Sequence, residues 1–203
     1  MRRHSTLAAV AAVAIVAAFQ SANAGLLGMP MGLKSAVQHI RLDTPTLPPM
    51  AYTMFCQRYQ GECRAKPLFR GGPVRLTEER WADLKKVNEI VNGSIAPERN
   101  TLDLAGEAWI INPDRGDCND YAVSKRHELL DRGWPARALL LSEVVTNSGE
   151  HHLILVVRTR SGDLVLDNMT PQIRPWSRAP YRWVRIQMPN NSKLWATIAS
   201  SRV

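Results

Sequence analysis

The sequence predicts an α+β fold in a chain of 203 residues. Two helical patterns come first and a run of short strands follows them, an order typical of helices packed on an antiparallel sheet and not of a doubly wound sheet. The connectors between the strands contain the Gly, Asn and Ser residues that hairpin turns favour. With 45% hydrophobic residues the chain can bury a sizeable core, which excludes a disordered chain and a scaffold held by disulfides alone.

Residues 1–24 have the pattern of a secretory signal peptide. A positive start precedes an almost wholly apolar stretch over residues 7–19, and a small-x-small cleavage site ends at Ala24. The apolar stretch is too short for a typical membrane span, and no later segment is long enough for one. We therefore expect a periplasmic or secreted protein with one mature domain over residues 25–203 and no transmembrane segment.

The net charge of +8 at pH 7 indicates a basic surface but not a nucleic-acid site. The Lys and Arg residues are scattered, with no block of five, and aromatic residues do not alternate with them as a stacking platform requires. We therefore expect no nucleic-acid partner.

Three cysteines in an oxidising compartment indicate one disulfide and one free thiol. Cys56 and Cys63 flank a turn-like stretch and are close in the sequence, so they are the expected disulfide pair. Cys118 stands alone far along the chain. A free thiol is a liability outside the cytoplasm unless it is buried or chemically useful, so Cys118 is the first candidate functional residue.

The mature chain is expected to begin with an irregular arm over residues 25–62, because prolines and glycines interrupt it repeatedly. The cysteine pair is expected to pin this arm. A first helix is predicted over residues 77–92, where Thr77 is a suitable N-cap and apolar residues recur at helical spacing. Gly93 is expected to stop it.

A second helix is predicted over residues 118–131. Asp117 is a suitable N-cap, and Gly133 and Pro135 follow the helix end. Four strands are expected after it, over residues 137–145, 151–158, 163–167 and 181–188, with hairpin turns over residues 146–149 and 159–162.

Cys118 lies at the predicted start of the second helix, and this position indicates a nucleophile. The unpaired N–H groups and the helix dipole favour a thiolate there, so we expect a lowered thiol pKa. A thiolate nucleophile gains from a neighbouring imidazole, which itself needs an acceptor to fix its tautomer.

The hairpin after this helix offers both groups. If its strands pair through a connector over residues 159–162, Asp167 lies opposite Ile154 and one diagonal step from His152, about 7–8 Å between backbone positions. Side chains can close that gap. His151 points to the opposite face of the strand.

Each of these residues also has an ordinary structural explanation. Cys118 could be a small buried apolar residue, His152 a histidine within a strand, and Asp167 part of a turn. A zinc site with Cys118 and His151 or His152 lacks the spacing of known zinc motifs. A redox role lacks a nearby resolving cysteine, unless the N-terminal cysteine pair supplies it. The order helix-Cys, strand-His, strand-Asp favours catalysis.

Three segments in this same order resemble the bacterial transglutaminase-like cysteine peptidases. They are Arg115-Gly116-Asp117-Cys118-Asn119-Asp120-Tyr121, His151-His152-Leu153-Ile154-Leu155 and Leu164-Val165-Leu166-Asp167-Asn168. The resemblance implies a papain/transglutaminase-like core, with the catalytic Cys at a helix N-terminus packed on an antiparallel β-sheet. By this resemblance Cys118 is the nucleophile, His152 the general base and Asp167 the residue that orients His152.

The resemblance also implies a function. Its best-understood relatives are periplasmic proteases that cleave large surface adhesins, so the expected partner is a protein substrate, such as a cell-surface adhesin, attacked through an acyl-enzyme. Two other functions stay open. The same acyl-enzyme could pass to an amine, as in a transglutaminase or amidase, or the fold could serve as an interaction protein without turnover.

The same relatives make Ca²⁺ a candidate cofactor, because they use acidic residues on both sides of the catalytic Cys. Asp117 matches on one side, whereas Asn119 replaces the other acid and offers a carbonyl oxygen at lower charge. Asp120 is a further candidate ligand. For the oxyanion, the nucleophile's own backbone N–H needs a second donor, for which Trp109 and Asn112 are candidates.

Overall fold

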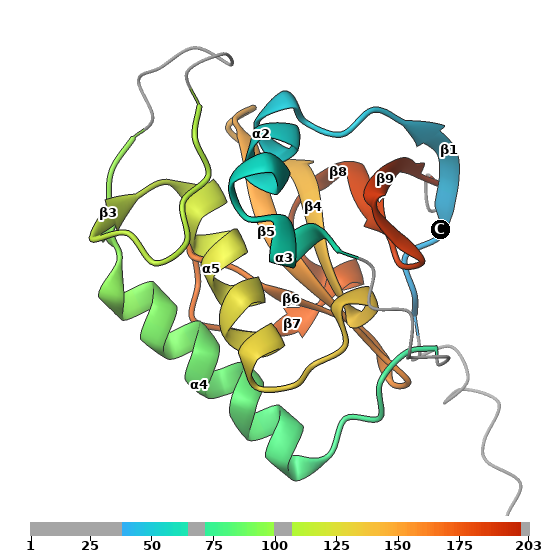
Figure 1. Cartoon of the computed structure of the whole chain (residues 1–203). Helices are drawn as coiled ribbons and strands as arrows, with labels where there is room; N and C mark the ends of the chain where they lie inside the picture. The colour runs from blue at the N-terminus through green and yellow to red at the C-terminus, as the bar shows by residue number, and fades with distance from the viewer. Residues whose placement is uncertain (1–37, 65–71, 100–106, 200–203) are drawn as a thin grey trace, which may run out of the picture. The chain divides into compact units, whose positions relative to one another are not determined.

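The computed structural model describes residues 38–64, 72–99 and 107–199 (Figure 1). The leader expected over residues 1–24 lies outside the described residues, as does the first part of the expected arm. Within the described ranges, no helix combines the length and the apolar character that a membrane span requires.

The α+β prediction is confirmed, because the described chain combines helices with an antiparallel sheet. The elements are β1 (Leu42–Thr46), α2 (Met50–Arg58), α3 (Gln60–Cys63), α4 (Glu78–Ser94), β2 (Ala96–Pro97), β3 (Arg115–Gly116), α5 (Cys118–Asp131), β4 (Leu139–Val145), β5 (His151–Thr159), β6 (Gly162–Leu166), β7 (Arg174–Pro175), β8 (Arg182–Met188) and β9 (Asn191–Ile198). Seven strands form one sheet in the order β1-β9-β8-β4-β5-β6-β7, and every neighbouring pair is antiparallel. Short β2 and β3 pair in parallel.

Helix α4 forms close to where the sequence predicts it. The Thr77 hydroxyl caps its start by accepting from the Arg80 backbone N–H at 3.3 Å. Leu84, Val87 and other inward residues are buried, as the helical spacing of apolar residues predicts. Gly93 does not stop the helix, which ends at Ser94, two residues beyond the predicted end at residue 92.

Helix α5 begins and ends where the sequence predicts, and it packs against β5 and α4 (Figure 1). A short 3-10 turn over Ala136–Ala138 follows it, so β4 begins at Leu139 and not at the expected Arg137. Because α5 packs on β5, Cys118 at its start lines the same cleft as the adjacent His151 and His152.

The β5–β6 hairpin has the register that the sequence predicts. Arg158 pairs with Asp163, and Leu155 pairs with Leu166. The turn is tighter than expected, because Thr159 and Gly162 also pair and only two residues remain between them. Gly162 has a φ of +114°, which a residue with a side chain rarely adopts.

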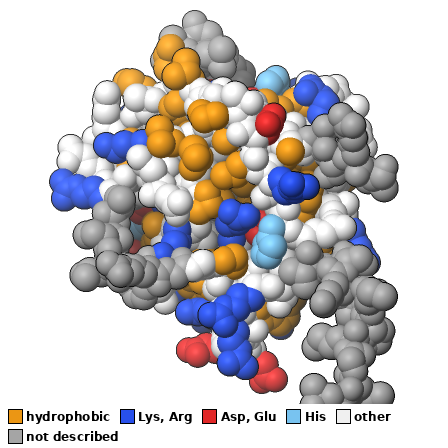
Figure 2. Space-filling view, turned by 90° about the vertical axis from the view of Figure 1, so that its right-hand side faces the viewer, with side chains coloured by type: hydrophobic (Ala, Val, Ile, Leu, Met, Phe, Trp, Pro, Cys, Tyr) orange, Lys and Arg blue, Asp and Glu red, His pale blue; other side chains and the backbone are white. Residues whose placement is uncertain are grey.

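The expectation of an irregular arm over residues 25–62 is wrong for its described part, which forms β1, α2 and α3. Among the described strands, β1 is an edge strand that pairs only with β9, an element that the sequence analysis also does not predict. An edge strand tolerates Pro45, which made the segment read as irregular. Figure 2 views the face that carries β1 and β9 and shows hydrophobic side chains gathered on it.

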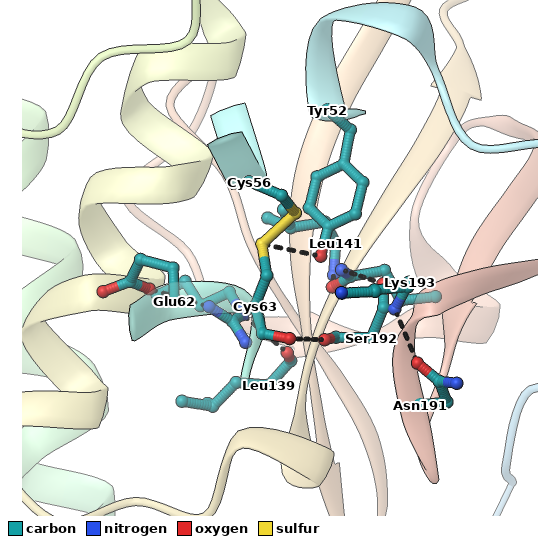
Figure 3. The surroundings of a disulfide bond; sticks show 11 residues. Tyr52, Cys56, Glu62, Cys63, Leu139, Leu141, Asn191, Ser192 and Lys193 are labelled. Atoms are coloured by element: carbon teal, nitrogen blue, oxygen red, sulfur yellow. Dashed lines mark hydrogen bonds and ion pairs between the residues drawn. A yellow bond between two sulfur atoms is a disulfide. The ribbon is translucent and has the colours of Figure 1, made fainter. Parts of the chain in front are cut away.

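Cys56 of α2 and Cys63 of α3, the expected pair, are joined by a disulfide (Figure 3). Glu62 of α3 forms an ion pair with the buried Arg126 of α5 at 2.7 Å. The His127 ring also lies 2.7 Å from the Glu62 carboxylate. These contacts fix α2 and α3 against the helix that begins with Cys118.

Candidate active site

Cys118 carries the free thiol of the described chain and is the first residue of α5. The Asp117 carboxylate caps this helix by accepting from the Asn119 backbone N–H at 2.9 Å. Asp120 accepts in return from the Asp117 backbone N–H at 3.0 Å, which completes a capping box. Gly116 makes room for this turn, because a Cβ there would lie 2.8 Å from the Asp120 Cβ. The thiol is thus held at the N-terminus of the helix.

The expected lowering of the Cys118 pKa is wrong for this structure. Burial raises the pKa of the Cys118 thiol to about 12, and the carboxylates of Asp117, Glu107 and Asp167 add to the rise. A hydrogen bond from the Leu153 backbone lowers the pKa but is outweighed. The sequence shows the helix start but not the burial or the approach of these carboxylates. The resting thiol is therefore neutral.

His152 and Asp167 lie in contact, as the hairpin register predicts. His152 Nε2 is 2.9 Å from Asp167 Oδ1, and both side chains are buried. Burial alone would raise the pKa of Asp167, but hydrogen bonds from His152, Tyr181 and the Met169 backbone bring it below its usual value. A charged carboxylate is therefore held against one imidazole nitrogen, and Nδ1 of the ring is left for another partner.

Tyr181 is a residue of this site that the sequence reading missed. Its hydroxyl donates to Asp167 Oδ2, and its ring centroid lies 5.6 Å from that of His152. Burial and the Asp167 carboxylate raise the pKa of Tyr181, so the hydroxyl keeps its proton and stays a donor. Tyr181 lies directly before β8, far along the chain from His152, and no local pattern in the sequence signals its role.

His151 has a different partner from its neighbour. Its Nδ1 lies 2.5 Å from Glu143 on β4, and Arg185 of β8 contacts the other oxygen of the same carboxylate at 2.5 Å. The two histidines therefore diverge, as alternation along a strand predicts. Of the two, His152 contacts Asp167.

Cys118 and His152 open into one cleft of about 380 Å³. The two residues come from α5 and β5, so the packing of this helix on this strand creates the shared space. The other lining residues are Leu47, Pro48, Pro49, Met50, Ala51, Glu107, Trp109, Asn119, Glu143, His151, Leu153 and Arg185.

Of the two candidates for the second oxyanion donor, Trp109 lies at the cleft and Asn112 does not. Trp109 lines the cleft, and its buried indole N–H donates to Glu107 at 3.2 Å. Asn112 is not part of the cleft lining, because its side-chain amide donates to Glu128 at 3.0 Å. Trp109 therefore shares the cleft with Cys118, although its N–H is given to Glu107, and Asn112 does not line the cleft.

The three candidate calcium ligands do not form a set as expected. Both carboxylate oxygens of Asp120 accept backbone N–H groups, from Ile110 at 2.7 Å and from Asp117 at 3.0 Å. Asn119 donates its side-chain amide to Glu107, which the sequence reading had not included. Among the described residues, no group of three or more His, Cys, Asp or Glu side chains is arranged to hold a metal ion.

Comparisons with known proteins agree with this fold. The family described as bacterial transglutaminase-like cysteine proteinase matches residues 42–203. No curated protein matches the sequence.

Two of the similar solved structures are of Legionella pneumophila LapG. The calcium-bound form has a TM-score of 0.50 and 24% identity, over 61% of this chain and 73% of that chain. The EGTA-treated form has a TM-score of 0.50 and 22% identity, over 61% of this chain and 69% of that chain. At these identities the likeness shows a shared fold.

Proposed function

The chain belongs to the bacterial transglutaminase-like cysteine proteinases, and from that premise we propose that it cleaves a protein substrate through an acyl-enzyme formed on Cys118. The observation that carries this proposal is the buried His152–Asp167 pair in a cleft that His152 shares with a free thiol. A nucleophile, a base and a group that orients the base are the parts that acyl transfer requires.

In the proposed reaction, Cys118 Sγ attacks the substrate carbonyl carbon and its proton passes to Nδ1 of His152. His152 then gives this proton to the departing amine, and the thioester remains on Cys118. Water next attacks the thioester, with His152 as the base, and releases the acid product. Asp167 holds the imidazole in one tautomer and stabilises its charged form.

A neutral resting thiol makes the base essential. Because burial raises the pKa of Cys118 to about 12, little thiolate exists at neutral pH before substrate binds. Proton removal by His152 therefore accompanies the attack. The developing oxyanion is proposed to meet the Cys118 backbone N–H at the helix start; the indole N–H of Trp109 lines the same cleft but donates to Glu107 in the resting site.

Ca²⁺ is proposed as an accessory ion held beside the nucleophile by Glu107, Asp117 and Asn119, not by Asp120. Glu107 and Asn119 each keep one side-chain oxygen that no donor among the described residues contacts. Burial raises the Glu107 pKa, and Asp117 lies close enough to add to this rise. Such oxygens suit Ca²⁺, with backbone carbonyls and water completing the shell. When bound, Ca²⁺ would offset the carboxylate charges around Cys118.

We also propose that the protein is exported and acts on an exported substrate. The leader pattern over residues 1–24 supports a periplasmic or secreted enzyme, and the proposed substrate is a surface adhesin or another exported protein.

Labelling of the thiol tests the proposed function. We expect a peptidyl chloromethyl ketone to alkylate Cys118 in the wild-type protein and to react far more slowly after His152→Ala. Digestion of an exported adhesin, with a fluorescent primary amine present, then separates hydrolysis from amine transfer by the mass of the product. Labelling that is equally fast in both proteins would overturn the assigned base, and product carrying the amine would replace the peptidase with a transglutaminase.

A further inference from the structure

One wall of the cleft beside Cys118 takes no part in the proposed chemistry. It is the segment over residues 47–50, which runs from the end of β1 into the first residue of α2 and lines the cleft. Leu47 is 79% exposed and Met50 67% exposed. Single exposed apolar side chains are ordinary, but two large ones at the rim of a cleft that holds a nucleophile mark a contact surface.

This segment is held in place by the rest of the protein. Arg185 Nη1 donates to the Leu47 carbonyl at 2.7 Å, and the same guanidinium contacts Glu143 at 2.5 Å. Pro48 and Pro49 restrict the backbone between Leu47 and α2. Further along α2, the disulfide joins this helix to α3 (Figure 3). Because residues 47–50 are already held in one conformation, binding of a substrate there loses little conformational entropy of this segment.

The backbone of this wall offers a substrate few hydrogen bonds. Pro48 and Pro49 have no N–H group, and the Leu47 carbonyl already accepts from Arg185. Many peptide-binding proteins bind a peptide by pairing it as an extra strand, which needs free backbone N–H and C=O groups. This wall offers few of them. The wall therefore offers a substrate mainly the apolar side chains of Leu47 and Met50.

The charged groups that reach the 47–50 wall are bound to one another. Glu143 contacts both His151 and Arg185, and Arg185 also donates to the Leu47 carbonyl. A charged substrate side chain against the 47–50 wall would lose water and gain no partner, which is unfavourable. An apolar side chain gains from burial at the same place.

We propose that residues 47–50 form a specificity subsite that receives a large apolar side chain of the substrate, such as Leu, Met or Phe, within about three residues of the scissile bond. The distance follows from the cleft, since about 380 Å³ holds the thiol and the wall together and an extended chain advances about 3.3 Å per residue. This inference rests on the proposed peptidase function and adds its substrate class.

A peptide library tests the subsite. The full-length wild-type protein and its Leu47→Glu and Met50→Glu variants are incubated with peptides from a digested proteome, and the new ends are read by mass spectrometry. We expect the wild type to enrich apolar residues at one position within three residues of the cut. Each Glu variant should lower that enrichment about tenfold or more and favour Lys or Arg there.

Two controls separate the subsite from the chemistry. Ile90→Glu changes a 47% exposed apolar residue of α4 that does not line the cleft and should leave the cleavage profile unchanged. Alkylation of Cys118 by iodoacetamide, which is too small to need the wall, should still proceed in every variant and shows that the nucleophile survives each substitution. Cleavage by the wild type without apolar preference, or an unchanged profile in both Glu variants, overturns the subsite and leaves the peptidase standing. A wild type that cleaves no peptide although Cys118 is alkylated overturns the proposed function, and the subsite with it.

Discussion

At the scale of single residues, the site depends on which side chain touches which. His152 and Asp167 were predictable because a short hairpin fixes its own register, and the pairing of Arg158 with Asp163 carries through to the site. Tyr181 and Glu107 were not predictable, because other parts of the fold bring them in. The thiol pKa was predicted in the wrong direction for the same reason, since burial is a property of the packed molecule.

The contrast between the two histidines gives the first prediction. Cys118→Ala, His152→Ala and the double variant should be about equally inactive, because groups that act as one unit are not additive. General-base catalysis is worth about 10²–10⁴-fold, so His152→Ala should lose at least that in kcat. His151→Ala should lose much less, since His151 contacts Glu143 and not Asp167. Turnover of a peptide substrate measures all four. The opposite order for the two histidines would refute the assigned roles.

Tyr181→Phe tests the hydroxyl that supports Asp167. Without this donor the Asp167 pKa should rise, because the Tyr181 hydrogen bond helps to lower it. Activity needs the charged carboxylate, so the acidic limb of the kcat profile should move to higher pH while KM stays constant. Tyr59→Phe is the matched control, since no hydrogen bond of its hydroxyl is found among the described residues. A pH profile that Tyr181→Phe leaves unmoved would show that the contact is only structural.

The pH dependence of alkylation tests the state of the thiol. A group with a raised pKa loses its proton late, so the iodoacetamide rate at Cys118 should keep rising from neutral pH toward about 12 in calcium-free buffer. The rate is followed by the mass of the modified protein. A plateau already reached below neutral pH would mean that the thiol rests as a thiolate, contrary to the burial argument.

At the scale of elements, the sequence predicts best what is local. Helix α5 has its cap and its stop signals within a short stretch, and its bounds were predicted correctly. Strand β1 was missed because its partner β9, which was also missed, lies at the other end of the chain. In β1, the edge position makes Pro45 acceptable, and that position is visible only in the sheet.

The capping box gives the prediction at this scale. Asp120→Ala removes the acceptor of two backbone N–H groups, those of Ile110 and Asp117. Losing a cap and its partners should lower the free energy of unfolding by about 1–3 kcal/mol. Gly116→Ala should also destabilise, because its new Cβ would overlap Asp120. Urea unfolding measures both.

Asp131→Ala is the control for this pair, since Asp131 lies at the other end of α5 and is exposed. It should change the free energy of unfolding by less than about 0.5 kcal/mol, as surface substitutions usually do. An Asp120→Ala protein as stable as wild type would show that the start of α5 is held by other contacts.

At the scale of the whole molecule, the sheet brings the site together from distant parts of the chain. Helix α5 supplies the thiol, the β5–β6 hairpin supplies the imidazole and the carboxylate, and the segment before α2 supplies a wall (Figure 1). The order of these parts was readable from the sequence. The wall formed by residues 47–50 was not predictable, because it is placed by long-range contacts: β1 pairs with β9, and Arg185 donates to the Leu47 carbonyl.

Calcium is a test of the whole molecule, because an ion that binds only the folded protein stabilises all of it. At a Ca²⁺ concentration about 100 times Kd the gain is about 2.7 kcal/mol. For a chain of this size each kcal/mol raises Tm by about 2–4 °C, so Ca²⁺ should raise Tm by about 5–10 °C and EGTA should reverse the rise.

Asp117→Asn keeps a good helix cap but removes a charge from the proposed ligands, so its Ca²⁺ response should be much smaller. Asp131→Asn, at the far end of the same helix, should respond as the wild type does. Calorimetry of EGTA-dialysed protein with and without CaCl₂ decides the matter: equal Tm values would mean that the departure at Asn119 has removed the site.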